Sequence, residues 1–196
     1  MSIQDDRNTM RNRRRAISSR QQDDAAQRIF QKIEEQNLLE SAKRVAIYFP
    51  NDGEINTLEM PERFYRSNRN WYLPRLSKHG KKMMEFALFA KDTKMKVNKF
   101  GIPEPSAEDS EGEPAHRMDI IFLPLVSFDR KGNRLGMGGG YYDATLASAN
   151  QGGLSDTMLV GLAHHFQENF QLLAQSWDVK LDMIITNQEL ICVKPK

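Results

Sequence analysis

The sequence has little of what would place it in several broad classes of protein. Cys192 is the only cysteine among 196 residues, which excludes an internal disulfide framework and fits a reducing cytoplasm. No apolar run approaches the length that spans a membrane, and the N-terminus lacks the apolar core of a secretory signal. We therefore expect a cytoplasmic protein that makes no contact with a membrane.

The excess of positive over negative charge is also small. The net charge of +2 implies no protein-wide field that would attract nucleic acid. The chain shows no internal repeat, and its length suits one domain, residues 1–196, with a real hydrophobic core. We expect this domain to be a monomer that binds no nucleic acid.

Glycine, in contrast, is concentrated in one segment between a predicted strand and a predicted helix. The apolar run from Asp119 to Phe128 predicts a buried strand, and residues 141–148 are typical of the first turns of a helix. Between them lie ten residues around which we organise the rest of the chain. They are Arg134, Leu135, Gly136, Met137, Gly138, Gly139, Gly140, Tyr141, Tyr142 and Asp143.

This segment has the chemistry of a phosphate site. Successive glycine N–H groups can form an anion-binding nest, and a helix N-terminus adds positive potential. Arg134 can fork onto phosphate oxygens, and Asp143 can hold the Mg²⁺ that accompanies a nucleotide. The pattern is not a P-loop, since no Gly-Lys-Ser/Thr follows, and Tyr141 replaces the third glycine of the dinucleotide fingerprint. A mobile loop is the alternative.

The rest of the chain alternates between helical and strand patterns. We predict helices over residues 1–17 and 20–37 and a short one from Thr57 to Ser67, with strands over 44–49, 70–76, 85–90, 157–163, 183–186 and 189–193. Pro74 indicates an edge or terminal strand. The alternation predicts an open, Rossmann-like α/β fold of three layers, a mostly parallel sheet flanked by helices.

Three further features each have two interpretations. Glu54 follows a strand, where ligands of open α/β sheets bind, but can equally be a solvated turn carboxylate. Phe100 leads a turn-rich loop and can stack on a ligand or pack in the core. His164 and His165 suggest a metal, but neighbours on a strand point to opposite faces, which disfavours zinc.

The glycine segment also carries a family resemblance. RLGMGGGYYD, preceded by LPLVSFDRKGN, closely resembles the signature of the 5-formyltetrahydrofolate cyclo-ligases, also called methenyltetrahydrofolate synthetases. The resemblance extends over nearly the whole chain through a basic N-terminal helix, RVAIYFPNDGEINT, FGIPEP and WDVKLD. It implies a three-layer α/β fold and conversion of 5-formyltetrahydrofolate to 5,10-methenyltetrahydrofolate that depends on ATP and Mg²⁺. The formyl oxygen would attack the γ-phosphate, N10 would close the ring, and ADP and phosphate would be released.

The same resemblance implies roles for individual residues. Residues for ATP would be Arg7 and the segment from Arg134 through Leu135, Gly136, Met137, Gly138, Gly139 and Gly140 to Tyr141 and Tyr142. Residues for the folate, with or without a polyglutamate tail, would be Phe49, Glu54, Phe100, Tyr141 and Tyr142. Asp143 and Asp178 would hold the metal, with Asp182 as the nearby alternative to Asp178, and Arg134, Tyr141 and Tyr142 would act in catalysis. Other members carry basic residues where this chain has Met137 and Gly139.

Two other functions remain as alternatives. A phosphosugar- or CoA-handling enzyme could bind phosphate at the same loop on a related α/β fold. A nucleic-acid-binding module could use the arginines of the N-terminal segment, and its binding would depend steeply on salt.

Overall fold

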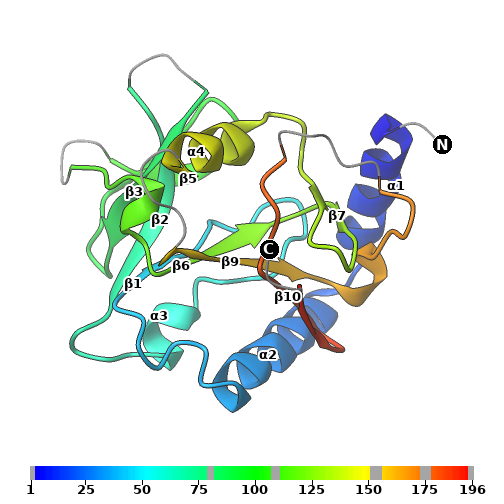
Figure 1. Cartoon of the computed structure of the whole chain (residues 1–196), viewed down its shortest axis with the longest axis horizontal. Helices are drawn as coiled ribbons and strands as arrows, with labels where there is room; N and C mark the ends of the chain where they lie inside the picture. Colours follow the sequence, from blue (N-terminus) through cyan, green and yellow to red (C-terminus); the bar gives the residue numbers. More distant parts are fainter. Residues whose placement is uncertain (1–2, 79–81, 107–110, 151–155, 173–177, 194–196) are drawn as a thin grey trace.

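A seven-stranded sheet forms the centre of the protein (Figure 1). The computed structural model describes residues 3–78, 82–106, 111–150, 156–172 and 178–193. In spatial order the strands are β11 (Leu190–Cys192), β10 (Met183–Thr186), β9 (Met158–Ala163), β6 (Ile120–Pro124), β1 (Arg44–Ala46), β2 (Asn70–Leu76) and β3 (Met84–Phe89). Neighbours from β10 to β2 are parallel, while β11 and β3 join the two edges in antiparallel pairing. The mostly parallel sheet predicted from the sequence is confirmed.

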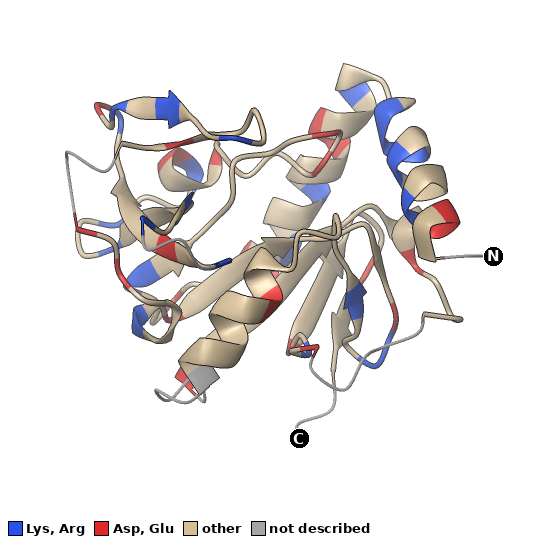
Figure 2. Ribbon diagram, turned by 90° about the horizontal axis from the view of Figure 1, so that it is seen from above, with Lys and Arg blue, Asp and Glu red and all other residues tan. Residues whose placement is uncertain are grey.

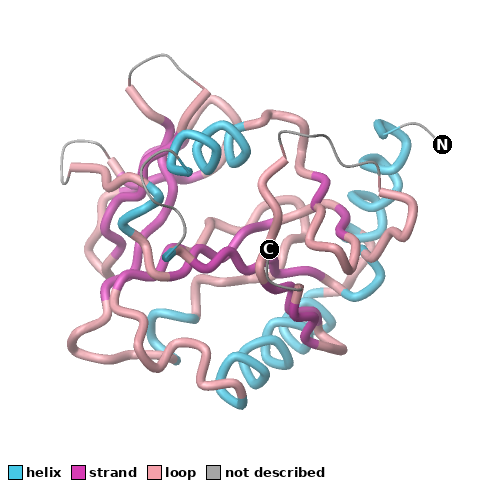
Figure 3. The backbone as a smooth tube through the Cα atoms, in the orientation of Figure 1, coloured by secondary structure: helices cyan, strands magenta, loops and turns pink. Residues whose placement is uncertain are grey.

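Helices cover both faces of this sheet, which gives the three predicted layers (Figures 1 and 3). The helices are α1 (Ile3–Arg15), α2 (Ser19–Glu35), α3 (Met60–Arg63) and α4 (Tyr141–Asn150). Ile29 of α2 belongs to the same apolar cluster as Val45 of β1, whereas Leu146 of α4 belongs to the cluster that contains Ala46. Because Val45 and Ala46 are neighbours on one strand, their side chains point to opposite faces. One apolar core therefore lies beneath α2 and α3 and another beneath α4.

The order of the strands reverses between β1 and β6. The chain passes from β1 to β2 on one side, and from β6 through β9 to β10 on the other. Since β1 and β6 are parallel neighbours, their carboxyl ends open at the same place. Such a reversal is where open α/β sheets bind their ligands. The segments that follow these two strands are residues 47–54 and 125–140.

The prediction of a single strand over residues 119–128 was wrong in one respect. This segment divides into β6 and a second, short strand after it. The carbonyls between the two bond to side chains. The Leu125 carbonyl accepts hydrogen bonds from Arg14 at 3.0 Å and Gln167 at 2.7 Å, and the Val126 carbonyl accepts from Gln167 at 2.9 Å. The chain therefore leaves the large sheet and forms the hairpin of β7 (Ser127–Phe128) and β8 (Arg134–Leu135), which leads into the glycine segment.

Two local predictions were also wrong. Pro74 does not mark an edge, since β2 lies between β1 and β3. The last residue of β1 that pairs with β2 is Ala46, opposite Tyr72, so Pro74 lies beyond the residues of β2 that pair with β1. The N–H group that proline lacks is therefore not needed for this pairing. Thr57 does not cap a helix that reaches Ser67: its hydroxyl donates to the Tyr48 carbonyl, and α3 is a single turn.

Within the described ranges, no helix has both the length and the apolar character needed to cross a membrane.

Candidate functional site

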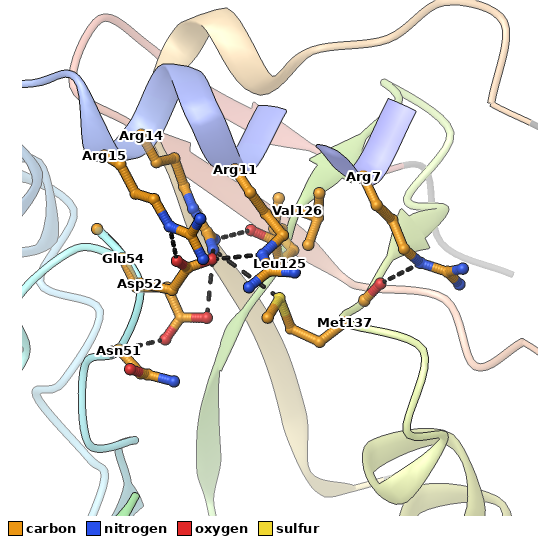
Figure 4. A network of polar contacts seen from close by, with 12 residues as sticks. Arg7, Arg11, Arg14, Arg15, Asn51, Asp52, Glu54, Leu125, Val126 and Met137 are labelled. Carbon is orange, nitrogen blue, oxygen red and sulfur yellow. Dashed lines mark hydrogen bonds and ion pairs between the residues drawn. The ribbon is translucent and has the colours of Figure 1, made fainter. Parts of the chain in front are cut away.

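Three segments from distant parts of the chain meet outside the carboxyl ends of β1 and β6 (Figure 4). They are helix α1, the turn of residues 50–54 after β1, and the glycine loop of residues 136–140. Arg7 of α1 donates from Nε to the Gly136 carbonyl at 3.0 Å, and Arg14 contacts both the turn and Met137. The structure thus brings Arg7 to the glycine loop, next to which the resemblance placed the nucleotide.

The glycine loop has a backbone that only glycine adopts without strain. Gly138 has a φ of +92° and Gly140 a φ of +70°, both in the left-handed region that penalises a Cβ atom. Helix α4 begins at the next residue, Tyr141. The free N–H groups of its first turn therefore adjoin the loop, which is the arrangement that the sequence predicted for phosphate.

Arg134 lies before this loop and is 8% exposed. Its guanidinium donates to Asp143 at 2.5 Å and to the Val179 carbonyl. Burial lowers the pKa of Arg134, while the nearby charges of Asp143 and Asp178 raise it. The two aspartates predicted to bind metal are thus brought to the same guanidinium, Asp143 from the first turn of α4 and Asp178 from a segment that follows this helix in the chain.

Glu54 lies in the turn after β1, and only 10% of its side chain is exposed. Its carboxylate accepts a hydrogen bond from the Asn51 N–H at 3.1 Å and lies 3.7 Å from Nη1 of Arg14. Burial raises the pKa of Glu54 to about 7, although the positive charge of Arg14 acts in the opposite direction. Burial and the nearby Glu54 charge also raise the pKa of Tyr48 and of Tyr142. Glu54 and Tyr142, both predicted folate residues, therefore lie close enough for the charge of one to affect the pKa of the other.

Phe100, which is exposed, and Tyr141, which is partly buried, form an aromatic surface beside the loop. Phe100 lies at the turn between β4 (Met95–Val97) and β5 (Pro103–Pro105) and is 51% exposed, so the interpretation of Phe100 as a core residue was wrong. Its ring meets Tyr141 edge-on at a centroid distance of 5.4 Å. Lys99 places its ammonium 5.3 Å from the Phe100 ring and 5.5 Å from the Tyr141 ring.

Phe49, the remaining predicted folate residue, is half-buried and packs against the core beneath α2. Sequence reasoning missed Lys99 because nothing distinguished it from other surface lysines. It also missed Arg14 and Asp52. Figure 2 shows an acidic first turn and then several basic residues along α1, and such a run of arginines gives no sign of which one is buried.

The two adjacent histidines point to different surroundings. The ring of His164 lies 3.3 Å from the Gly53 carbonyl, and burial lowers its pKa to about 4. His165 approaches Glu168 and Glu189, with ligand atoms within 4.8 Å of one another. Arg130 already forms ion pairs with both of these glutamates, at 2.6 and 2.5 Å. A guanidinium thus occupies the place that a cation would need.

A mostly parallel sheet, a reversal of strand order and a glycine loop that leads into a helix N-terminus define this protein as an open α/β protein of the ligand-binding kind. The sequence profile described as the 5-formyltetrahydrofolate cyclo-ligase family matches residues 2–187. The chain therefore belongs to the 5-formyltetrahydrofolate cyclo-ligase family.

Individual relatives agree with this assignment. The chain is 41% identical over 177 residues to the 5-formyltetrahydrofolate cyclo-ligase of Haemophilus influenzae, covering 89% of this chain and 92% of that one. It is 32% identical to the Escherichia coli K12 protein of the same name, with 90% and 96% covered. The solved structure of Aquifex aeolicus 5,10-methenyltetrahydrofolate synthetase superimposes with a TM-score of 0.80 at 25% identity, covering 100% of this chain and 95% of that one. The corresponding protein of Mycoplasma pneumoniae, at 24% identity with 95% and 99% covered, has the same fold, with a TM-score of 0.75.

Proposed function

We propose that this enzyme converts 5-formyltetrahydrofolate to 5,10-methenyltetrahydrofolate at the site between α1, the turn of residues 50–54 and the glycine loop, with ATP as the co-substrate. Family membership supports the reaction. The observation that carries its location is the convergence of two kinds of chemistry where the strand order reverses. A glycine loop suited to phosphate lies beside a mostly buried carboxylate, Glu54, and a partly exposed aromatic surface formed by Phe100 and Tyr141.

The folate would be held by its pterin ring. The N–H groups on the edge of a pterin are donors, and the ionised carboxylate of Glu54 can only accept. Phe100 and Tyr141 offer exposed ring surface for stacking, worth ~1–3 kcal/mol by analogy with nucleic-acid bases. Lys99 lies over these two rings, so its side chain would have to move aside when the pterin stacks there.

The reaction would activate an unreactive amide oxygen. The formyl oxygen attacks the γ-phosphate of ATP and the bond to ADP breaks, which gives an imino-phosphate whose electrophilic carbon carries the phosphorylated oxygen. N10 then closes onto that carbon and phosphate leaves. Such a transfer needs positioning and neutralised charge more than a strong base. The N–H groups of the glycine loop and Arg134 are suited to this, and Tyr142, close to Glu54, is suited to orienting the formyl group.

Asp143 and Asp178 are the residues we assign to Mg²⁺. Both are carboxylates near Arg134, next to the loop, and oxygen donors are what this ion prefers. The Asp143 side chain is 35% exposed, so one of its oxygens can face a ligand. When bound, the ion would supply positive charge to the phosphate oxygens, which matters here because Met137 and Gly139 contribute none.

The arginines of α1 favour this function over nucleic-acid binding. Each of them has a partner within the protein: Arg7 with Gly136, Arg13 with Phe166, and Arg11, Arg14 and Arg15 with Asp52. These contacts hold the guanidinium groups in fixed positions against the protein's own turn and glycine loop, where a bound nucleotide would lie, and not along a surface that could follow a phosphate backbone. We also propose that the protein is cytoplasmic and monomeric and accepts folates with or without a polyglutamate tail.

The test is ADP release in the presence of Mg²⁺, measured with and without 5-formyltetrahydrofolate. ADP release that requires the folate, together with the absorbance of the methenyl product, is expected. Replacing Arg134 by Ala removes a preorganised charge, and turnover should fall by roughly 10²-fold or more. ATP hydrolysis at the same rate with and without the folate would overturn the proposed reaction. Normal turnover of a folded Arg134→Ala protein would overturn the role of this residue.

A further inference from the structure

Arg14 is the one residue of α1 among the largest fully buried side chains, with 0% of its surface exposed. The neighbouring arginines of the helix lie at its surface or edge. A guanidinium keeps its charge at any ordinary pH, and a buried charge is costly unless it is paired and hydrogen-bonded. The contacts that satisfy Arg14 therefore determine how the surrounding segments can be arranged.

Those contacts reach three segments, which Figure 4 shows around the guanidinium. Nη2 donates to Asp52 at 3.1 Å, and Nη1 lies 3.7 Å from Oε1 of Glu54, both in the turn after β1. Nη1 also donates to the Leu125 carbonyl at 3.0 Å, after β6. The sulfur of Met137, in the glycine loop, lies 4.0 Å from Nη2. The planar fork thus fixes Glu54 relative to the loop.

The turn that carries Glu54 is shaped to receive this helix. Gly53 has a φ of +76°, and a Cβ atom there would lie 2.9 Å from the backbone of Arg14. Asp52 has a φ of +54°, unusual for a residue with a side chain. Three arginines of α1, namely Arg11, Arg14 and Arg15, hold its carboxylate. The strained turn and the buried guanidinium therefore support each other.

We propose that Arg14 is a positioning residue that couples the folate carboxylate Glu54 to the glycine loop, so that occupation of one binding site strengthens binding at the other. The proposal rests on the proposed function, which assigns Glu54 to the folate and the loop to ATP. A ligand that fixes Met137 also fixes one face of the guanidinium, and with it the position of Glu54. Such coupling is reciprocal, because each ligand must change the affinity of the other by the same factor.

The test measures the dissociation constant of 5-formyltetrahydrofolate with and without a saturating, non-hydrolysable ATP analogue. In the wild-type protein we expect the analogue to tighten folate binding by about 5-fold or more, the lower end of ordinary coupling between sites. Arg14→Lys keeps the charge but loses the planar, forked guanidinium. The ratio of the folate dissociation constants without and with the analogue should therefore fall to less than about 2-fold. The affinity for the analogue alone should change little.

Arg13→Lys is the matched control. Arg13 lies on the same helix, but it stacks on Phe166 and donates to that residue's carbonyl, which lies apart from Glu54 and Met137 in the sequence and is not among the contacts of Arg14. Its ratio should equal that of the wild type. If Arg14→Lys does not fold, the double variant Arg14→Met with Asp52→Asn removes two buried opposite charges together and leaves Glu54 without its cation. This double variant should fold, and the ATP analogue should not tighten its folate binding.

Two outcomes would overturn the proposal. One is a wild-type protein whose folate affinity is unaffected by the analogue, and the other is an Arg14→Lys protein whose ratio equals that of Arg13→Lys. Both can occur while ADP release still requires the folate. Failure of the coupling is thus distinguished from failure of the proposed function.

Discussion

Arg134 and Asp143 form an ion pair of 2.5 Å that links the strand before the glycine loop to the first turn of the helix after it. The sequence suggests separate tasks for these residues, a cation for phosphate and a ligand for Mg²⁺. In the structure they neutralise each other, and the side chain of Arg134 is only 5% exposed. Binding of a nucleotide with its metal would therefore rearrange a pair that already exists.

Replacing Asp143 by Asn tests the metal assignment. The substitution keeps the shape of the side chain but removes the charge, so the Mg²⁺ concentration for half-maximal folate-dependent ATP hydrolysis should rise. A Mg²⁺ titration of ADP release measures this. Asp182→Asn is the control, because Asp182 accepts a hydrogen bond from the Leu159 N–H at 2.8 Å; it should lower the melting temperature without moving the titration. Superimposable curves for Asp143→Asn and the wild type would mean that Asp143 does not serve the metal.

Phe100→Ala should weaken folate binding and leave the fold intact. The ring is half exposed, so its loss removes stacking on the pterin, ~1–3 kcal/mol, or roughly 5- to 150-fold in affinity, and little core packing. Folate and nucleotide titrations measured beside thermal melts separate these effects. Tyr65→Ala is a control for removing an exposed ring, since Tyr65 is 76% exposed and follows α3 beneath the sheet. Unchanged folate affinity in Phe100→Ala would refute the stacking role.

The carboxyl group of Glu54 should make both stability and folate binding depend on pH near neutrality. Burial raises its pKa to about 7 in the folded protein, against the opposing charge of Arg14 and with Asp52 adding to the rise. A raised carboxyl pKa gives stability that is complete below the unfolded value, about 4.3, and is lost as the pH rises through about 7. The melting temperature of Glu54→Gln should therefore decline less than that of the wild type between these limits.

Folate binding should respond in the opposite sense. The pterin donors require the ionised carboxylate, so the affinity of the wild-type protein should increase as the pH rises through about 7. The amide of Glu54→Gln should give a weaker, flatter profile. Parallel pH profiles for the two proteins would assign the titration to a group other than Glu54. Neither Tyr48 nor Tyr142 could be that group, because burial raises the pKa of both further above neutrality.

Gly138→Ala tests whether the loop is preformed. A Cβ atom at a φ of +92° is strained, so the free energy of unfolding without ligands should fall by ~1–2 kcal/mol. Gly136→Ala is the matched control in the same loop. No atom of the described residues lies within 4 Å of its added Cβ, and its φ is outside the left-handed region, so its stability should change by less than about 0.5 kcal/mol. Equal melting curves for the two variants would mean that the free protein does not hold this loop conformation.

The sequence predicted best what depends on local pattern. The three layers follow from hydrophobic periodicity, and the junction of the glycine loop with α4 follows from bare backbone next to a helical pattern. Prediction from the sequence failed where contacts with side chains from distant parts of the chain determine the local structure. The strand over residues 119–128 breaks because Arg14 and Gln167 take the carbonyls of Leu125 and Val126. Those partners are 41 or more residues away in the chain, beyond the reach of any local pattern.

The ion pairs within the site could not be predicted from the sequence either. Arg134 and Asp143 are nine residues apart, and only the turn of the loop makes them neighbours. The burial of Arg14 depends on a turn that places Asp52 beneath it, and the sequence offered five arginines in α1 with no reason to prefer one. Whether Phe100 was core or surface also remained open until the hairpin of β4 and β5 was known.

Helix α1 has one further consequence, for the order in which the protein is made. Its partners at Asp52, Leu125, Gly136 and Phe166 follow it by 38, 111, 129 and 153 residues. A 13-residue helix with no docking surface is only marginally stable in water. During synthesis α1 therefore leaves the ribosome long before the surface that it will cover exists. The earliest of these elements to be translated is the last that can be put in place.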